Sequence, residues 1–202
     1  MKLVWKGIYK GEEQLPKGEL PPDAVPFKEP KTPAEVSIKS CAWVMPVVVL
    51  ALLLVYIKSL ITGVWVLPIS LWGLLLALAA ALPHELLHAV CFPAEAVVEM
   101  YVSPKHLMAF VHSIYPVSKR RFIGLSLLPA AVLGLLPMLI WLAVPDGIGG
   151  AILFTFGLTG LTLGVGDFLN AFNAARQVPK SALTQLPGFH SYWFMPETHT
   201  NT

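Results

Sequence analysis

The chain has 202 residues, of which 55% are hydrophobic and only 13% are charged, and its mean hydropathy is +0.67. This composition excludes an ordinary soluble domain, and runs of about 20 apolar residues are long enough to cross a bilayer core of about 30 Å. The formal net charge of +2 comes without a basic cluster of the kind that binds nucleic acid, so we expect no nucleic-acid partner.

Residues 1–40 form a polar N-terminal arm. They contain seven lysines, six acidic residues and six prolines. Proline at that density prevents a long helix, so we expect a loosely structured cytoplasmic segment. Leu3, Trp5 and Ile8 precede the prolines and are compatible with a short strand or an interfacial anchor. The arm has no apolar run of the signal-peptide type, so no cleaved signal is expected.

Residues 41–175 form the predicted membrane domain. Its apolar runs predict spans at about 41–57, 64–92, 122–144 and 148–171. The second run is longer than a perpendicular span needs, and Pro83 is expected to kink or restart its helix just before His84. Residues 97–115 are rich in β-forming residues around a turn at 103–106, which predicts a small hairpin. The predicted fold is therefore an all-α integral membrane protein of about four transmembrane helices, with one small β-hairpin between spans 2 and 3.

The lysines and arginines predict the orientation of these spans. The arm has seven, the first loop has one, the 93–121 loop has four, the third loop has none and the tail, residues 176–202, has two. Because positively charged loops stay on the cytoplasmic side, both termini are expected in the cytoplasm. The sequence thus predicts a multi-pass protein of the plasma membrane, with the lipid bilayer as a partner.

The motif HELLH occupies residues 84–88, inside the second apolar run. On a helix His84 and His88 lie 40° apart and about 6 Å along the axis, so both imidazoles reach one tetrahedral ion. Glu85 points to the side, where its carboxylate can take a proton from a zinc-activated water. The alternative is a pair of structural histidines bonded to neighbouring helices. Each polar residue in an apolar span costs about 2–3 kcal/mol, which disfavours a chance occurrence.

Zinc requires a third protein ligand, and Asp167 is the candidate. His84 lies 20 residues after Val64, and Asp167 lies 19 residues after Ile148. Both counts start at the outer face, so both side chains fall near the cytoplasmic end of their spans. Asp167 also belongs to a face of small residues that lets helices approach closely, and the alternative is a role in helix packing alone. The remaining candidate ligands are Cys91, Glu95, Glu99, His106, His112 and His190.

Two asparagines follow Asp167 on the same predicted helix. Asn170 and Asn173 are candidates to donate a hydrogen bond to a tetrahedral oxyanion or to contact the substrate. The alternative for each is a helix-end cap.

Residues 64–175 resemble the DUF3267 family of zincin peptidases and, more distantly, the site-2 protease class of intramembrane metalloproteases. The resemblance rests on HELLH in a membrane helix, on Pro129 in the following span after two arginines, and on an aspartate in a later glycine-rich span. It implies a cytoplasm-facing site in which His84, His88 and Asp167 ligate Zn²⁺ and Glu85 is catalytic. Two departures from the site-2 pattern are the setting Gly-Asp-Phe of the aspartate and the absence of a PDZ-like insertion.

The expected function is an integral-membrane zinc metalloprotease that cleaves a membrane-associated protein or peptide near the cytoplasmic face, with Glu85 as general base. The hairpin at 97–115 is a candidate to hold the extended substrate by strand addition. Two alternatives stay open, a catalytically inactive metal-binding membrane protein and a small transporter component. Glu85 argues against the first, because a pure metal binder needs no carboxylate there. The lack of an evident internal repeat argues against the second.

Overall fold

The computed structural model describes residues 1–30, 33–106 and 108–196. The chain forms two compact units. The helical unit comprises Pro30–His84 and Leu127–Leu169, and the β-rich unit comprises Met1–Glu29, Glu85–Ser126 and Asn170–Thr202. Three helices run from one unit into the other: α4 (Ala81–Ala89), α5 (Lys119–Pro129) and α8 (Val165–Gln177).

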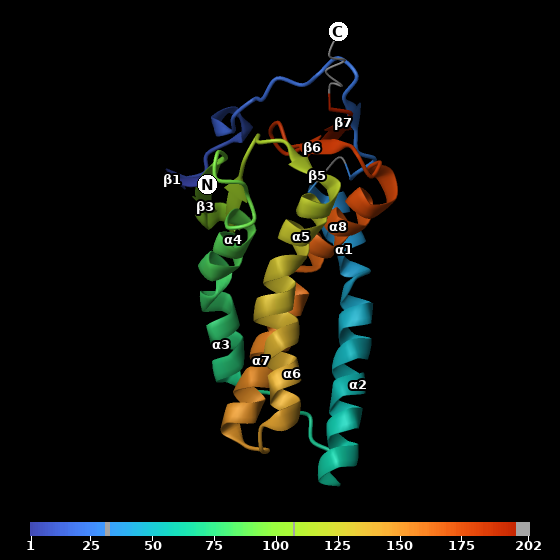
Figure 1. Ribbon diagram of the computed structural model, residues 1–202. Coiled ribbons are helices and arrows are strands. Elements are labelled where there is room, and N and C mark those ends of the chain that lie inside the picture. The colour runs from blue at the N-terminus through green and yellow to red at the C-terminus, as the bar shows by residue number, and fades with distance from the viewer. Residues whose placement is uncertain (31–32, 107, 197–202) are drawn as a thin grey trace. The chain divides into compact units, whose positions relative to one another are not determined.

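The helical unit is built from helices (Figure 1). Besides the shared helices it contains α1 (Pro33–Cys41), α2 (Val44–Thr62), α3 (Leu71–Ala79), the π-helical segment η3 (Ala130–Leu135), α6 (Leu136–Ala143) and α7 (Ile148–Leu163). Its core lies around Trp141 and Phe154, whose ring centroids are 4.6 Å apart. On α2 the buried positions, among them Val47, Ala51 and Leu54, recur every three or four residues, as expected for one helix face against a core.

Two glycines allow α7 to pack directly against η3. A Cβ atom on Gly157 would lie 2.5 Å from the carbonyl oxygen of Gly134, and one on Gly160 would lie 2.6 Å from that of Leu133. Such distances leave no space for a side chain, so the small residues are required for this close approach. The part of the small-residue face formed by these two glycines therefore has the packing role expected of it.

Within the described residues, two helical segments are long and apolar enough to cross a membrane, Ile38–Thr62 and Lys119–Ala143. Two further pairs qualify only if each bent pair counts as one span. They are α3 with α4, bent by 43°, and α7 with α8, bent by 50°. The apolar side chains Leu52, Leu53, Leu60 and Ile61 of α2 are exposed, as expected of a helix surface that faces lipid. These features are consistent with a membrane protein.

The second apolar run folds differently from its prediction. Its helix begins at Leu71 and not at Val64, since Pro68 disfavours helical backbone at the residue before it. The break falls at Ala80 and not at Pro83. Pro83 instead lies in the first turn of α4, where a missing backbone N–H costs no helical hydrogen bond. His84 consequently starts the regular part of a new helix.

The β-rich unit shows that the all-α prediction is wrong. The described residues contain seven strands: β1 (Lys2–Ile8), β2 (Val25–Pro26), β3 (Val97–Ser103), β4 (Met108–His112), β5 (Val117–Ser118), β6 (Leu183–Gln185) and β7 (Tyr192–Phe194). They form a three-stranded sheet in the order β1-β3-β4 and a four-stranded sheet in the order β2-β7-β6-β5. Four of the strands have only two or three residues, too few for an alternating pattern to be read from sequence. Two 3-10 turns, η1 (Glu12–Gln14) and η2 (Pro104–His106), complete the unit.

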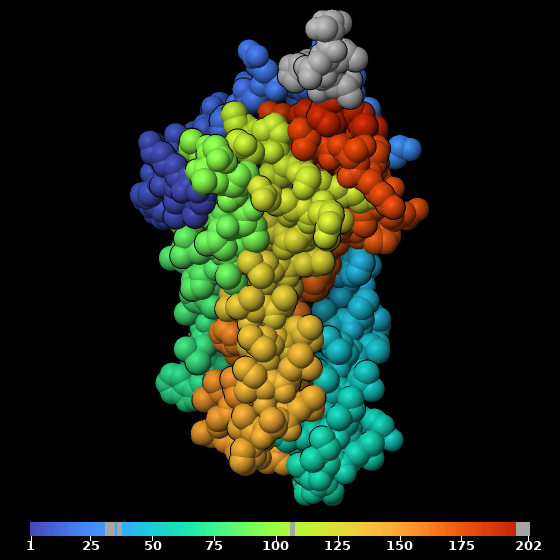
Figure 2. Space-filling view, viewed as in Figure 1, coloured from blue at the N-terminus to red at the C-terminus, as the bar shows by residue number. Residues whose placement is uncertain are grey.

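The expected hairpin at 97–115 is present as the antiparallel pair β3 and β4, in which Tyr101 lies opposite Phe110. The short strand that Leu3, Trp5 and Ile8 suggested is present as β1, which pairs in parallel with β3, so this part of the arm is not loosely structured as expected of the arm as a whole. In the space-filling view the dark-blue N-terminal residues lie directly against the green residues around β3 (Figure 2). The boundaries at residues 40 and 175 concern the position of the chain in a bilayer, and they stay a prediction.

Candidate metal centre

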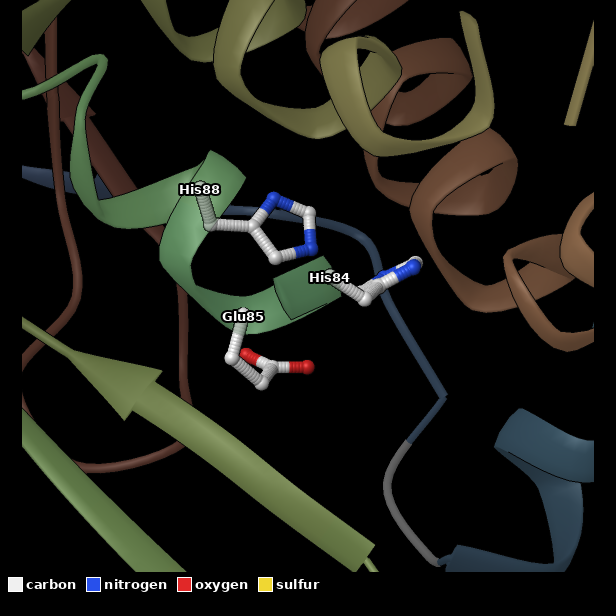
Figure 3. Close-up of side chains that lie close together, drawn as sticks. All are labelled: His84, Glu85 and His88. Carbon is white, nitrogen blue, oxygen red and sulfur yellow. The ribbon is translucent and has the colours of Figure 1, made fainter. Parts of the chain in front are cut away.

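The HELLH motif lies on α4, and its three polar side chains gather on that helix (Figure 3). The backbone N–H of His84 donates to the carbonyl of Ala80 at 2.9 Å, which fixes the first turn. The metal-binding atoms of His84, Glu85 and His88 all lie within 4.8 Å of one another. One turn of helix therefore brings two imidazoles and a carboxylate to one place, as the spacing predicted.

Asp167 contacts the first histidine of the motif. Its Oδ2 atom lies 3.1 Å from Nε2 of His84, and the two side chains are only 18% and 16% exposed. Asp167 stands in the first turn of α8, where the positive end of the helix dipole favours a carboxylate. The expected proximity of Asp167 to His84 is confirmed, whereas its role as a metal ligand stays a prediction.

The second histidine is oriented by a backbone group. Nδ1 of His88 lies 2.7 Å from the carbonyl oxygen of Leu125 on α5. A carbonyl oxygen only accepts, so Nδ1 carries the proton and donates it, and the lone pair of the neutral ring is on Nε2. Metal-binding histidines almost always make such a bond through the other ring nitrogen, which fixes tautomer and orientation. His88 is thus held in the form that a divalent metal requires.

Glu85 is held against strand β4. Its Oε2 atom accepts a hydrogen bond of 3.0 Å from the backbone N–H of Val111. Among the described residues β4 pairs with β3 alone, so it is an edge strand of its sheet there. Since the N–H of Val111 points to Glu85 and not to β3, the backbone groups of Ala109, two residues away, face the same open edge. The carboxylate of the motif therefore lies beside a strand edge that can accept another strand.

The other candidate ligands make different contacts. Nε2–H of His112 donates to the carbonyl of Gly188, Nδ1 of His190 lies 3.3 Å from Glu29, and the thiol of Cys91 donates to the carbonyl of Leu87. Glu99 pairs with Lys6 and accepts a bond from Tyr101. Glu95 is exposed, and the side chain of His106 lies outside the described residues.

The two asparagines lie on α8 beyond Asp167. Asn170 is exposed, and Asn173 lines a cavity in the β-rich unit. Within the described part of the chain, no hydrogen bond joins either of them to residues 84–88. Their proposed contacts with an oxyanion or a substrate stay predictions.

The donor set fits zinc. Imidazole nitrogens and carboxylate oxygens are ordinary zinc ligands, and ligand atoms about 2.0–2.1 Å from a tetrahedral ion lie about 3.3 Å from one another. The distance of 3.1 Å between His84 and Asp167 is close to that value. The backbone partners at Val111 and Leu125 were missed by the sequence analysis, because a backbone N–H or carbonyl is the same at every residue and leaves no sequence signal.

One family model matches the chain. It is DUF3267, described as "Putative zincin peptidase", and it matches residues 77–183. The match covers more than half of the 202 residues and includes HELLH and Asp167, so the chain belongs to this family. No curated protein and no solved structure matches the chain significantly. The family description supports, at a coarse level, a metallopeptidase that uses zinc.

Proposed function

We propose that this member of the DUF3267 family is an integral-membrane zinc metalloprotease that cleaves a membrane-associated protein or peptide near the cytoplasmic face. The observation that carries the proposal is the meeting of a motif histidine with Asp167, a carboxylate from a distant apolar segment. Two structural histidines alone do not require that partner. A zinc hydrolase does, because its catalytic site needs three protein ligands and one open position.

In this proposal Nε2 of His84, Nε2 of His88 and the carboxylate of Asp167 hold the metal. When bound, zinc lowers the pKa of a water ligand and polarises the scissile carbonyl. The bond from His88 to Leu125 keeps the second ring in its binding tautomer, and the partial burial of the His84–Asp167 pair limits competing water. Cys91 takes no part, since its thiol bonds within its own helical turn.

Glu85 acts as the general base and then as the general acid. Its carboxylate takes a proton from the attacking water and delivers it to the nitrogen of the leaving amine, as such motifs require. The bond from the N–H of Val111 keeps the carboxylate at the edge of β4, and that edge is where we place the substrate. An extended peptide added to β4 would bond to the open backbone groups of Ala109, with its next residues beside Glu85.

The membrane setting rests on composition and helix length. In the part of the chain that the structure describes, two apolar helical segments and two bent pairs of helices are available as spans. The lysine and arginine bias favours cytoplasmic termini, and Lys119, Arg120 and Arg121 form the first turn of α5. We therefore propose a multi-pass protein of the plasma membrane, whose partners are the bilayer and a membrane-associated substrate.

The test compares Glu85→Gln with Glu95→Gln, an exposed carboxylate ten residues further on. We expect both variants to keep wild-type zinc, measured by metal analysis of protein purified in detergent. Glu85→Gln should lose about 10²–10⁴-fold in cleavage of a quenched-fluorescent peptide library, whereas Glu95→Gln should cleave normally. Wild-type cleavage by Glu85→Gln would contradict the mechanism. Zinc binding without cleavage in the wild type instead supports the inactive metal-binding alternative.

A further inference from the structure

The β-rich unit contains a cavity that no part of the proposed peptidase reaction uses. Its volume is about 610 Å³, within the range of about 300–1,000 Å³ that is usual for small-molecule sites. Its walls come from three stretches of the chain: β2 with the following Lys28, the second half of α8, and Trp193 on β7. Three segments that are distant in sequence thus line one ligand-sized hollow that is open to the surface.

The cavity carries positive charge. Lys28 and Arg176 line it, and none of its lining residues is acidic. Glu29, the carboxylate next to Lys28 in sequence, is engaged elsewhere: it accepts a bond of 2.9 Å from the backbone N–H of Ser191 and lies 3.3 Å from His190. Within residues 1–30, 33–106 and 108–196 neither cation forms an ion pair with a carboxylate. Their charge is therefore available to an anionic ligand.

A reciprocal pair of hydrogen bonds fixes the two walls that carry these cations. The backbone N–H of Lys28 donates to Oε1 of Gln177 at 2.6 Å, and Nε2 of Gln177 donates to the carbonyl of Lys28 at 3.3 Å. The segment after β2 is thereby tied to the last turn of α8, which also carries Arg176. A site that is already assembled loses less conformational entropy when it binds.

Arg176 is held in an orientation suited to recognition. Its guanidinium carbon lies 5.3 Å from the ring centroid of Phe172, one turn earlier on α8. A second cation serves the end of that helix, because Nζ of Lys119 donates to the carbonyls of Ala175 and Val178 at 2.7 and 2.6 Å. A planar guanidinium resting on an aromatic ring offers its N–H donors as a fork, the geometry that matches phosphate oxygens.

We propose that this cavity binds a phosphate ester. Arg176 and Lys28 contact the phosphate oxygens, and the side-chain amide of Asn173 supplies a further donor in the same wall. Phosphate oxygens are arranged tetrahedrally and accept from several donors, so they match two cations and an amide better than a planar carboxylate does. The apolar surfaces of Trp193 and Phe172 accommodate the organic part of the ester. The same chemistry is offered by the headgroup of an anionic lipid and by a soluble phosphate.

Isothermal titration calorimetry on the full chain in dodecyl maltoside tests the proposal. The probes are dihexanoylphosphatidylglycerol, inorganic phosphate and monohexanoylglycerol, which lacks the phosphate. Arg176→Gln and Lys28→Gln should each weaken binding of the phosphate probe by about tenfold or more. Lys180→Gln removes an exposed lysine outside the cavity and should bind like the wild type. Arg176→Lys keeps the charge without the fork and should fall between the wild type and Arg176→Gln.

The outcomes separate the two sources of the ligand. Binding of the lipid probe alone supports a headgroup site, and binding of both phosphate probes supports recognition of the phosphate itself. The proposal is overturned if neither phosphate probe binds, if monohexanoylglycerol binds as tightly as the lipid, or if Arg176→Gln and Lys28→Gln, with wild-type thermal midpoints, bind as the wild type does.

Discussion

Nε2 of His84 and Oδ2 of Asp167 lie 3.1 Å apart, although 83 residues separate them in the chain. Each side chain is more than four-fifths buried, and this contact joins a histidine and a carboxylate from two apolar segments. The relationship predicts how the metal site responds to a change that keeps the shape of the aspartate but removes its charge.

Asp167→Asn is expected to weaken zinc binding by more than about 100-fold, because loss of a direct ligand exceeds the 10–100-fold typical of an outer-shell change. A competition titration with a chelating dye measures the affinity. Asp146→Asn is the matched control, since Asp146 is the other aspartate of the apolar segment 122–175 and pairs with Lys58. Equal zinc affinity in Asp167→Asn and the wild type would remove Asp167 from the ligand set.

The open edge of β4 predicts a variant that separates substrate binding from metal binding. Ala109→Pro removes an N–H that faces away from β3, so the β3–β4 ladder keeps its hydrogen bonds. We expect cleavage of the peptide library to fall about tenfold or more, because the substrate loses one hydrogen bond from the backbone of residue 109. The zinc content should not change. Ala109→Val, which keeps the N–H, should cleave normally. Wild-type cleavage by Ala109→Pro would exclude strand addition at this position.

A buried lysine stabilises the end of α6. Nζ of Lys58 donates to the carbonyls of Trp141 and Val144 at 2.8 and 2.6 Å, lies 3.4 Å from Asp146, and sits 4.6 Å from the ring centroid of Trp141. Lys58→Met leaves these carbonyls without their donor, so we expect a loss of about 2–4 kcal/mol in unfolding free energy. Thermal unfolding in detergent measures it, with the exposed Lys39→Met as control. A midpoint shift no larger than that of the control would contradict this role.

His112 predicts a dependence of stability on pH. It is 5% exposed, and burial lowers the pKa of its side chain, while its hydrogen bond to the backbone of Gly188 and the charge of Glu99 oppose the shift more weakly. Since an unfolded histidine titrates near 6.5, the unfolded chain binds the additional proton first as the pH falls. Stability is therefore full above about pH 6.5 and declines below it until the folded state is also protonated.

The measurement is the thermal midpoint of the wild type and of His112→Gln between about pH 7.5 and pH 5.5, a window around the histidine reference value. The thermal midpoint of His112→Gln should fall less than that of the wild type as the pH is lowered. His190→Gln removes an exposed histidine instead and is the matched control. Identical pH profiles for the wild type and His112→Gln would show that the buried histidine does not carry the effect.

The parts that sequence predicted are those with a local signal. The spacing of HELLH placed its three polar side chains together on one helix, and the β-forming residues on either side of a turn gave the hairpin β3–β4. The contact between His84 and Asp167 followed from two polar residues at similar depth in apolar runs. That agreement arose although the helix of the second apolar run, α3, starts at Leu71 and not at Val64. The depth count therefore brought the two side chains together correctly, but it began at the wrong residue.

The parts that sequence missed depend on distant or weak signals. The parallel pairing of β1 with β3 joins segments far apart in the chain, and its register has no trace in the local pattern. The break at Ala80 carries no glycine or proline, whereas Pro83, which attracted the prediction, fits into a first helical turn. The partners of Glu85 and His88 are the backbone groups of Val111 and Leu125, which any residue there would supply.

X-ray absorption at the zinc edge of the purified wild-type protein tests the central claim most directly. Ligation by His84, His88 and Asp167 predicts bound zinc whose nearest shell holds only nitrogen and oxygen at about 2.0–2.2 Å, with the outer scattering of two imidazoles. Asp167→Ala should change that shell and lose much of the zinc. A sulfur atom at about 2.3 Å would assign Cys91 to the metal instead. If the protein bound no zinc when one equivalent was supplied, the site itself would be contradicted.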